Sequence, residues 1–212
     1  MFCQIGVWRC ASCSFRLTPD EIGTGRRLCE FQSMMTFPEE YQASLEHLDS
    51  LLENHGDELA AVIIEPMVQG AGGMRMHSAE FLKTLATKVQ ERGILLITDE
   101  VMTGFGRTGK LFAVEHAGVS PDIMCVAKGL TGGILPLAVT MATDEIYSAF
   151  FSDDTRKAFL HGHSFTANPI ACAAARASLQ IFRDEPVLER IARLEEVYQA
   201  RLPKLACACC SC

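Results

Sequence analysis

Short apolar runs alternate with helical patterns along the middle of this 212-residue chain. The runs have the length of buried strands and lie at Leu59–Ile64, Ile94–Ile97 and Ile123–Ala127. Apolar residues at helical spacing occupy the stretches before the first run and before the second, at residues 38–56 and 78–93. This alternation predicts an α/β fold with a mostly parallel sheet covered by helices.

The pattern is less regular after the third run. An apolar stretch at Leu135–Thr140 is compatible with one more strand, and residues 144–160 look helical in part. The dipeptide Asn168-Pro169 is a strong helix start. A last amphipathic helix begins at Pro186, and we expect Pro203 to end it.

Each apolar run leads to an ionisable residue: Glu65 after the first, the pair Asp99-Glu100 after the second and Lys128 after the third. Parallel strands present their carboxyl ends at one edge, where ligands bind. A lysine among apolar neighbours can lose its proton and attack a carbonyl. A carboxylate nearby can hold a protonated pyridine nitrogen, so the pair offers what pyridoxal phosphate requires. A structural Asp99–Lys128 ion pair is the alternative that spacing alone leaves open.

The loop from Gly104 to Lys110 imitates two nucleotide-binding motifs. It matches G-x-G-x-x-G, but that motif should begin at the strand end and open a helix. It also matches G-x-x-x-x-G-K, but Leu111 stands where a Ser or Thr must bind magnesium. Neither motif is therefore complete.

Composition and charge narrow the possible classes of protein further. The net charge is −7 and no Lys/Arg stripe is present, which argues against a nucleic-acid partner. No apolar run approaches a membrane span, and the first residues do not resemble a signal peptide. We therefore expect a cytoplasmic protein with unpaired thiols. A zinc site between Cys10-x-x-Cys13 and the cysteines of the C-terminal tail is a minor alternative, and no metal is assigned.

Four segments resemble class III aminotransferases, in the same order along the chain. They read EPMVQGAGGM from Glu65, LITDEVMTGFGRTG around Asp99, AKGLTGG around Lys128 and HGHSFTANP from His161. The resemblance implies the large domain of a fold type I pyridoxal-phosphate-dependent transferase, present in part.

The resemblance also sets the expected limits of that domain. We expect its central part at residues 36–205. Residues 1–35 and the Cys-rich residues 206–212 do not resemble the family; they are left unassigned, as non-native or disordered ends.

The same resemblance assigns roles around the cofactor. It implies that Lys128 condenses with the cofactor aldehyde and then carries the proton between substrate and cofactor carbons. Asp99 would pair with the pyridine nitrogen, and Val101 would pack against the face of the ring. Lys128 and Asp99 are thus the expected catalytic residues.

Other matched positions would complete the site. His163 and Ser164 would reach the cofactor phosphate of a neighbouring subunit, which implies a homodimer, and Gly162 would lie close to the substrate. Glu65 and Arg107 would belong to the polar network around the substrate. For these two, a local structural role at the strand end and in the Gly-rich loop is an equal alternative.

Within this family the motifs are most similar to enzymes of biotin synthesis. Those enzymes transfer an amino group from S-adenosylmethionine to 8-amino-7-oxononanoate, giving 7,8-diaminononanoate. Another class III enzyme, acting on ornithine, 4-aminobutyrate or a similar ω-amine, and a non-catalytic fragment are the alternatives. The matched region omits the family's N-terminal phosphate cradle and C-terminal small domain, so we expect the chain alone to bind cofactor weakly and to transaminate little.

Overall fold

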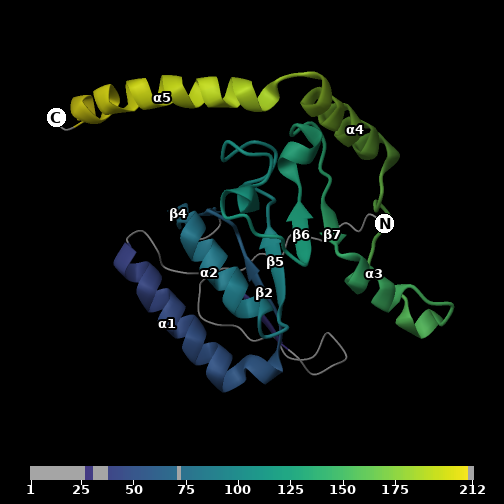
Figure 1. Cartoon of the computed structure of the whole chain (residues 1–212). Coiled ribbons are helices and arrows are strands. Elements are labelled where there is room, and N and C mark those ends of the chain that lie inside the picture. The colour runs from purple at the N-terminus through teal and green to yellow at the C-terminus, as the bar shows by residue number, and fades with distance from the viewer. Residues whose placement is uncertain (1–26, 31–37, 71–72, 210–212) are drawn as a thin grey trace.

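The computed structural model of the chain describes residues 27–30, 38–70 and 73–209, and its main feature is one five-stranded sheet (Figure 1). The strands are β1 (Arg27–Glu30), β2 (Leu59–Ile64), β5 (Leu95–Asp99), β6 (Ile123–Val126) and β7 (Val139–Ala142), and they lie side by side in that order. The first four are parallel, whereas β7 is antiparallel to β6. The predicted α/β fold with a mostly parallel sheet is confirmed.

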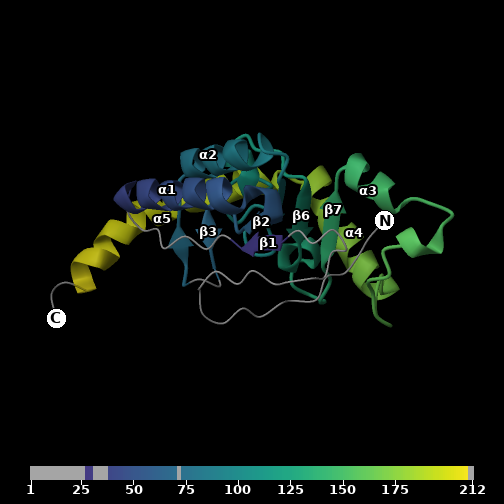
Figure 2. The ribbon, with the colours of Figure 1, turned by 90° about the horizontal axis from the view of Figure 1, so that it is seen from below.

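Two helices, α1 (Pro38–His55) and α2 (Ala79–Gln90), lie together over one face of this sheet (Figure 2). Their apolar side chains pack against those of β2 and β5. The largest fully buried members include Leu48, Leu82 and Leu85 from the helices and Val62, Ile64 and Leu96 from the strands. Because alternate strand residues face opposite sides, Ile63 and Ile97 point to the other face, where they are only half-buried. The main core therefore lies on the α1–α2 side.

The ends of these helices follow from their sequence. Pro38 is the first residue of α1, as predicted. The Ser78 hydroxyl caps α2 by accepting a hydrogen bond from the backbone N–H of Phe81 at 3.1 Å. After α2, Gly93 turns the chain into β5 with a left-handed φ of +67°, a conformation that favours glycine.

Three short strands give no pattern in the sequence. β1 lies inside residues 1–35, where the sequence predicts no strand or helix. β3 (Val68–Gln69) and β4 (Arg75–Met76) pair as an antiparallel hairpin between β2 and α2. β1, with the sequence RLCE, contains no apolar run, and the two-residue strands β3 and β4 are too short for an alternating pattern to be recognised.

The C-terminal third is mainly helical and contains α3 (Asp144–Phe150), α4 (Pro169–Asp184) and α5 (Val187–Cys209). Asn168 caps α4 by accepting hydrogen bonds from the backbone N–H groups of Ile170 and Ala171 at 3.0 and 3.2 Å. α4 packs beside β6 and β7 in a second core cluster, whereas α5 runs along the top of the molecule in Figure 1, with Leu188 and Ile191 close to Gly106 of the loop after β5.

The prediction that Pro203 ends the last helix is wrong, because Pro203 lies inside α5. A proline in a helix removes one backbone hydrogen bond at a cost of about 3 kcal/mol, which disfavours a helix without forbidding it.

Two features are absent from the described residues. None of their helices is long and apolar enough to cross a membrane. They contain no group of three or more His, Cys, Asp or Glu side chains placed to hold a metal ion. The cysteines of the alternative zinc site fall at positions 10 and 13 and in the C-terminal tail, outside the residues whose side chains are described.

The core predicts a contrast between two leucines. Leu96 on β5 is fully buried, whereas Leu194 on α5 is 54% exposed. We expect Leu96→Ala to lower the free energy of unfolding by about 2–5 kcal/mol, because it removes buried methyl groups and leaves a cavity. Leu194→Ala should change it by less than about 0.5 kcal/mol. Urea unfolding followed by circular dichroism measures both, and equal effects would contradict the assigned core.

Candidate active site

The sheet brings Asp99 and Lys128 to the same edge. β5 and β6 are parallel neighbours, and Asp99 stands opposite Cys125 in their register. The backbone N–H of Glu100 continues the pairing by donating to the carbonyl of Cys125 at 2.8 Å. Lys128 follows three residues after Cys125, at the start of the 3₁₀ turn η3 (Lys128–Thr131). Neighbouring strands lie about 4.8 Å apart, so the acid and the amine begin from adjacent strand ends.

The carboxylate of Asp99 is half-buried and oriented by the backbone. Its Oδ1 atom accepts a hydrogen bond from the N–H of Val101 at 2.9 Å. This contact holds the Asp99 carboxylate at the carboxyl-terminal end of β5. Val101 is itself half-buried at the same edge.

Lys128 adopts a left-handed backbone conformation, with φ of +43°. This region costs a residue with a Cβ about 1–2 kcal/mol, and such strain is concentrated at functional sites. The carbonyl of Lys128 accepts from the N–H of Gly133 at 3.1 Å, which closes the turn. The sequence predicts a lysine enclosed by apolar neighbours, but the side chain of Lys128 is exposed. The reason is that the chain leaves the strand after the buried Val126.

The residue after the lysine is in close contact with the loop after β5. A Cβ added to Gly129 would lie 2.8 Å from the Cβ of Phe105, which real Cβ atoms do not approach. Phe105 has a left-handed φ of +60°, and its ring meets that of Phe112 edge-on at 5.6 Å. Glycine at position 129 is therefore needed for the loop to lie against the lysine turn.

This loop does not have the structure of a nucleotide-binding loop. Residues 101–112 form successive turns and lead only into the short 3₁₀ turn η2 (Ala113–His116). Both nucleotide motifs place their glycines at the start of a helix. Arg107 lies exposed on this loop.

Glu65, at the end of β2, supports the neighbouring hairpin. Its Oε2 atom accepts a hydrogen bond from the N–H of Gly70 at 2.9 Å. Its carbonyl lies 3.0 Å from Nε2 of the buried His77, whose ring meets Phe81 edge-on at 5.4 Å. The described contacts of Glu65 thus attach the turn and the end of the hairpin to the end of β2, and Glu65 itself is half-buried.

The segment with Gly162, His163 and Ser164 is exposed. The N–H of Phe165 donates to Nδ1 of His163 at 3.1 Å, and the N–H of His163 donates to the Thr166 hydroxyl at 2.9 Å. These contacts keep His163 within its own turn. The structure therefore brings Asp99, Val101 and Lys128 to one edge and leaves the other three residues facing solvent.

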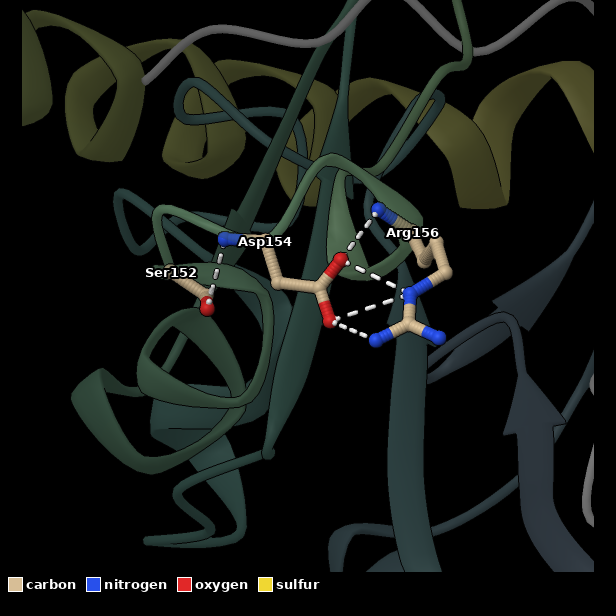
Figure 3. Close-up of polar contacts among 3 residues, drawn as sticks. All are labelled: Ser152, Asp154 and Arg156. Atoms are coloured by element: carbon tan, nitrogen blue, oxygen red, sulfur yellow. Dashed lines mark hydrogen bonds and ion pairs between the residues drawn. The ribbon is translucent and has the colours of Figure 1, made fainter.

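A short turn, η4 (Thr155–Lys157), precedes this exposed segment and is held by one carboxylate (Figure 3). Asp154 accepts from the backbone N–H of Arg156 at 3.0 Å and from its Nη2 at 2.8 Å, while its own N–H donates to the Ser152 hydroxyl at 3.1 Å. Hydrogen bonds from Arg156 lower the pKa of Asp154. Arg156 is exposed and Asp154 is only partly buried, so the pair shapes the turn more than it stabilises the fold.

Comparison with known proteins identifies the class. A family model described as aminotransferase class-III matches residues 24–208, and the chain belongs to this family. Class III aminotransferases depend on pyridoxal phosphate. The match begins before the region expected from the sequence motifs and includes β1.

Individual relatives show which members of the family this chain is similar to. The adenosylmethionine-8-amino-7-oxononanoate aminotransferase of Synechococcus elongatus is 52% identical over 164 residues, covering 72% of this chain and 39% of that protein. The crystal structure of the enzyme with the same name from Methanocaldococcus jannaschii has a TM-score of 0.73 at 40% identity, over 77% of this chain and 38% of its own. An (S)-enantioselective omega-transaminase from Thermomicrobium roseum has a TM-score of 0.66 at 39% identity, with coverages of 80% and 35%. The chain thus spans about two-fifths of the length of such relatives.

The buried His77 makes the stability of the fold depend on pH. Burial lowers its pKa below the ordinary value of 6.5, against the opposing effect of hydrogen bonds with the carbonyls of Glu65 and Ser78. The unfolded chain therefore binds the proton first as the pH falls. The contribution of His77 to stability is complete above pH 6.5 and is lost as the pH falls towards the folded-state value.

We expect the difference in unfolding free energy between wild type and His77→Gln to shrink on acidification, by at most about 1.4 kcal/mol per pH unit. Glutamine keeps a donor for the Glu65 carbonyl but takes up no proton. Urea unfolding of both proteins between about pH 5 and pH 8 measures this difference. A constant difference across that range would contradict a lowered pKa at His77.

Proposed function

We propose that this chain carries the cofactor-binding core of an aminotransferase that moves an amino group from S-adenosylmethionine to 8-amino-7-oxononanoate, giving 7,8-diaminononanoate. The observation that carries the proposal is the placement of Asp99 and Lys128 at adjacent parallel strand ends. Membership of the family and the names of the relatives support the reaction and its substrates.

The two residues fit pyridoxal phosphate by their chemistry and placement. The half-buried Asp99 carboxylate, oriented by the Val101 N–H, is suited to pair with a protonated pyridine nitrogen. The exposed Lys128 amine is accessible to an aldehyde. When bound, the cofactor supplies an electron sink for the electrons left at the substrate carbon after proton loss.

The residues of the chain then have separate tasks. Asp99 holds the positive charge of the pyridine nitrogen in place. The Nζ atom of Lys128 would hold the cofactor at its aldehyde end and would carry a proton to and from the substrate carbon. Val101 supplies apolar contact to one face of the ring. Glu65, directly after β2, and Arg107, on the loop after β5, would contribute polar contacts to the substrate.

A homodimer would complete this site. Gly162, His163 and Ser164 are exposed, so a second copy could receive them at its own Asp99–Lys128 edge. There His163 and the Ser164 hydroxyl would bind the cofactor phosphate, and Gly162 would lie by the substrate.

Exposed aromatic side chains beside this segment support the dimer. Phe151 is 75% exposed and stacks on Tyr147 at 5.6 Å, and Phe159 meets Phe150 edge-on at 5.3 Å. Clustered apolar surface of this kind is typical of protein interfaces.

We also propose a cytoplasmic location. The unpaired thiols of Cys125 and Cys172 support it.

A second candidate is amino transfer from another amine by the same residues. The likeness to the omega-transaminase of Thermomicrobium roseum favours it, since the strand-end pair does not discriminate between donors. The choice of donor separates the two candidates.

We expect the purified chain to develop a visible absorption band with pyridoxal phosphate and to lose it slowly when S-adenosylmethionine is added. Lys128→Ala should abolish the band and slow the donor reaction by about 100-fold or more, because the proton carrier is lost. Asp99→Asn should weaken binding, since a neutral amide holds the pyridine charge poorly.

Lys83→Ala is the matched control, since Lys83 is an exposed lysine on α2. It should behave as wild type in absorbance titration and in single-turnover measurements. A band unchanged in Lys128→Ala would contradict the proposed role of the lysine. Reaction with ornithine or 4-aminobutyrate, but not with S-adenosylmethionine, would favour the second candidate.

A further inference from the structure

Glu100 is the acidic residue next to Asp99, and its side chain is fully buried. Both carboxylate oxygens accept hydrogen bonds: Oε2 from the Thr103 hydroxyl at 2.5 Å and Oε1 from the N–H of Val114 at 2.9 Å. A buried carboxylate is costly unless such partners are present. Because its side chain is fully buried, Glu100 is not placed to react with a substrate.

The contacts of Glu100 join the two ends of the loop after β5. Thr103 lies at the beginning of this loop and Val114 at its end, in η2. The backbone takes part as well: the carbonyl of Glu100 accepts from the N–H of Gly104 at 3.0 Å, and its N–H donates to the carbonyl of Cys125 at 2.8 Å. A single residue thus connects β5, β6 and both ends of the loop.

The loop held in this way reaches the turn of Lys128. Phe105 lies between the two attachment points and is pressed against Gly129, the residue after the lysine. The Phe105 ring is further fixed by Phe112, 5.6 Å away, and by Phe182 of α4, 6.2 Å away. A displacement of the loop would therefore be transmitted to the lysine turn.

Glu100 also determines how Asp99 is presented. Successive strand residues point to opposite faces, so anchoring Glu100 on one side directs Asp99 to the other. The hydrogen bond that orients the Asp99 carboxylate comes from the N–H of Val101, the residue directly after Glu100. Glu100 therefore lies between the acid and its orienting donor in the chain.

We propose that Glu100 is a positioning residue that fixes Asp99 and Lys128 relative to each other through its hydrogen bonds to Thr103 and Val114. This proposal rests on the proposed function, because the geometry that it sets is that of the cofactor site. Glu100 does not itself bind the cofactor, and its effect extends to the turn at Lys128.

Four variants of the full chain test this role. Glu100→Ala removes both hydrogen bonds, and Glu100→Gln keeps them, because its amide oxygen accepts from Val114 while the Thr103 hydroxyl turns to accept from the amide nitrogen. Thr103→Val removes one donor at nearly constant shape. Glu115→Ala is the matched control: this carboxylate accepts from the N–H of Phe112 at 2.8 Å in the same loop but does not contact the end of β5.

Each variant is titrated with pyridoxal phosphate, and the visible circular dichroism of the bound cofactor records how its ring is held. We expect Glu100→Ala to raise the cofactor dissociation constant by about tenfold or more and to alter the visible spectrum, since small displacements of positioned groups cost large factors. Thr103→Val should fall between wild type and Glu100→Ala. Glu100→Gln and Glu115→Ala should match wild type.

Backbone amide hydrogen exchange of the protein without cofactor is the second readout. Glu100→Ala should accelerate exchange in residues 101–114 and also in the turn at residues 129–133, whereas Glu115→Ala should leave that turn unchanged. If wild type shows no lysine-dependent band, the proposed function fails and the exchange result decides the role of Glu100. Unchanged exchange at residues 129–133 in Glu100→Ala, a wild-type spectrum in that variant, or equal losses in Glu100→Gln would overturn the proposal.

Discussion

The parallel pairing of β5 with β6 is the constraint on which the site depends. It aligns Asp99 with Cys125 and so sets the acid beside the strand that leads to Lys128. The lysine leaves that strand through a left-handed turn, which carries its amine out of the buried sheet and into the open edge. The core of α1 and α2 stabilises this pairing from one face, and the loop held by Glu100 lies against the lysine turn through the contact of Phe105 with Gly129.

Much of this arrangement could be predicted from the sequence, because it rests on long-range periodicity. The apolar runs of β2, β5 and β6 and the helical stripes of α1 and α2 are regular enough to define the sheet and its covering face. The positions of Asp99 and Lys128 follow once the strands are known, since parallel strands share one functional edge. Local signals were equally clear at Ser78 and Asn168, whose side chains cap the helices that follow.

Other features depend on contacts that a sequence pattern does not contain. β1 and the β3–β4 hairpin are too short to show a period, and Pro203 is accommodated inside α5. The sequence suggests that Glu100 is exposed, because it is an acid beside another acid. In the structure it is fully buried, because donors from the loop satisfy its carboxylate. The exposure of Lys128 likewise follows from a backbone angle, which its apolar neighbours in sequence do not reveal.

The most direct measurement locates the lysine that reacts with pyridoxal phosphate. The chain is incubated with less than one equivalent of the cofactor, the lysine–cofactor C=N bond is reduced with borohydride, and the modified residue is mapped by peptide mass spectrometry. The arrangement of β5 and β6 predicts modification chiefly at Lys128. Even labelling of the exposed lysines, or labelling of a different single lysine such as Lys110, would contradict the assignment of this strand edge as the cofactor site.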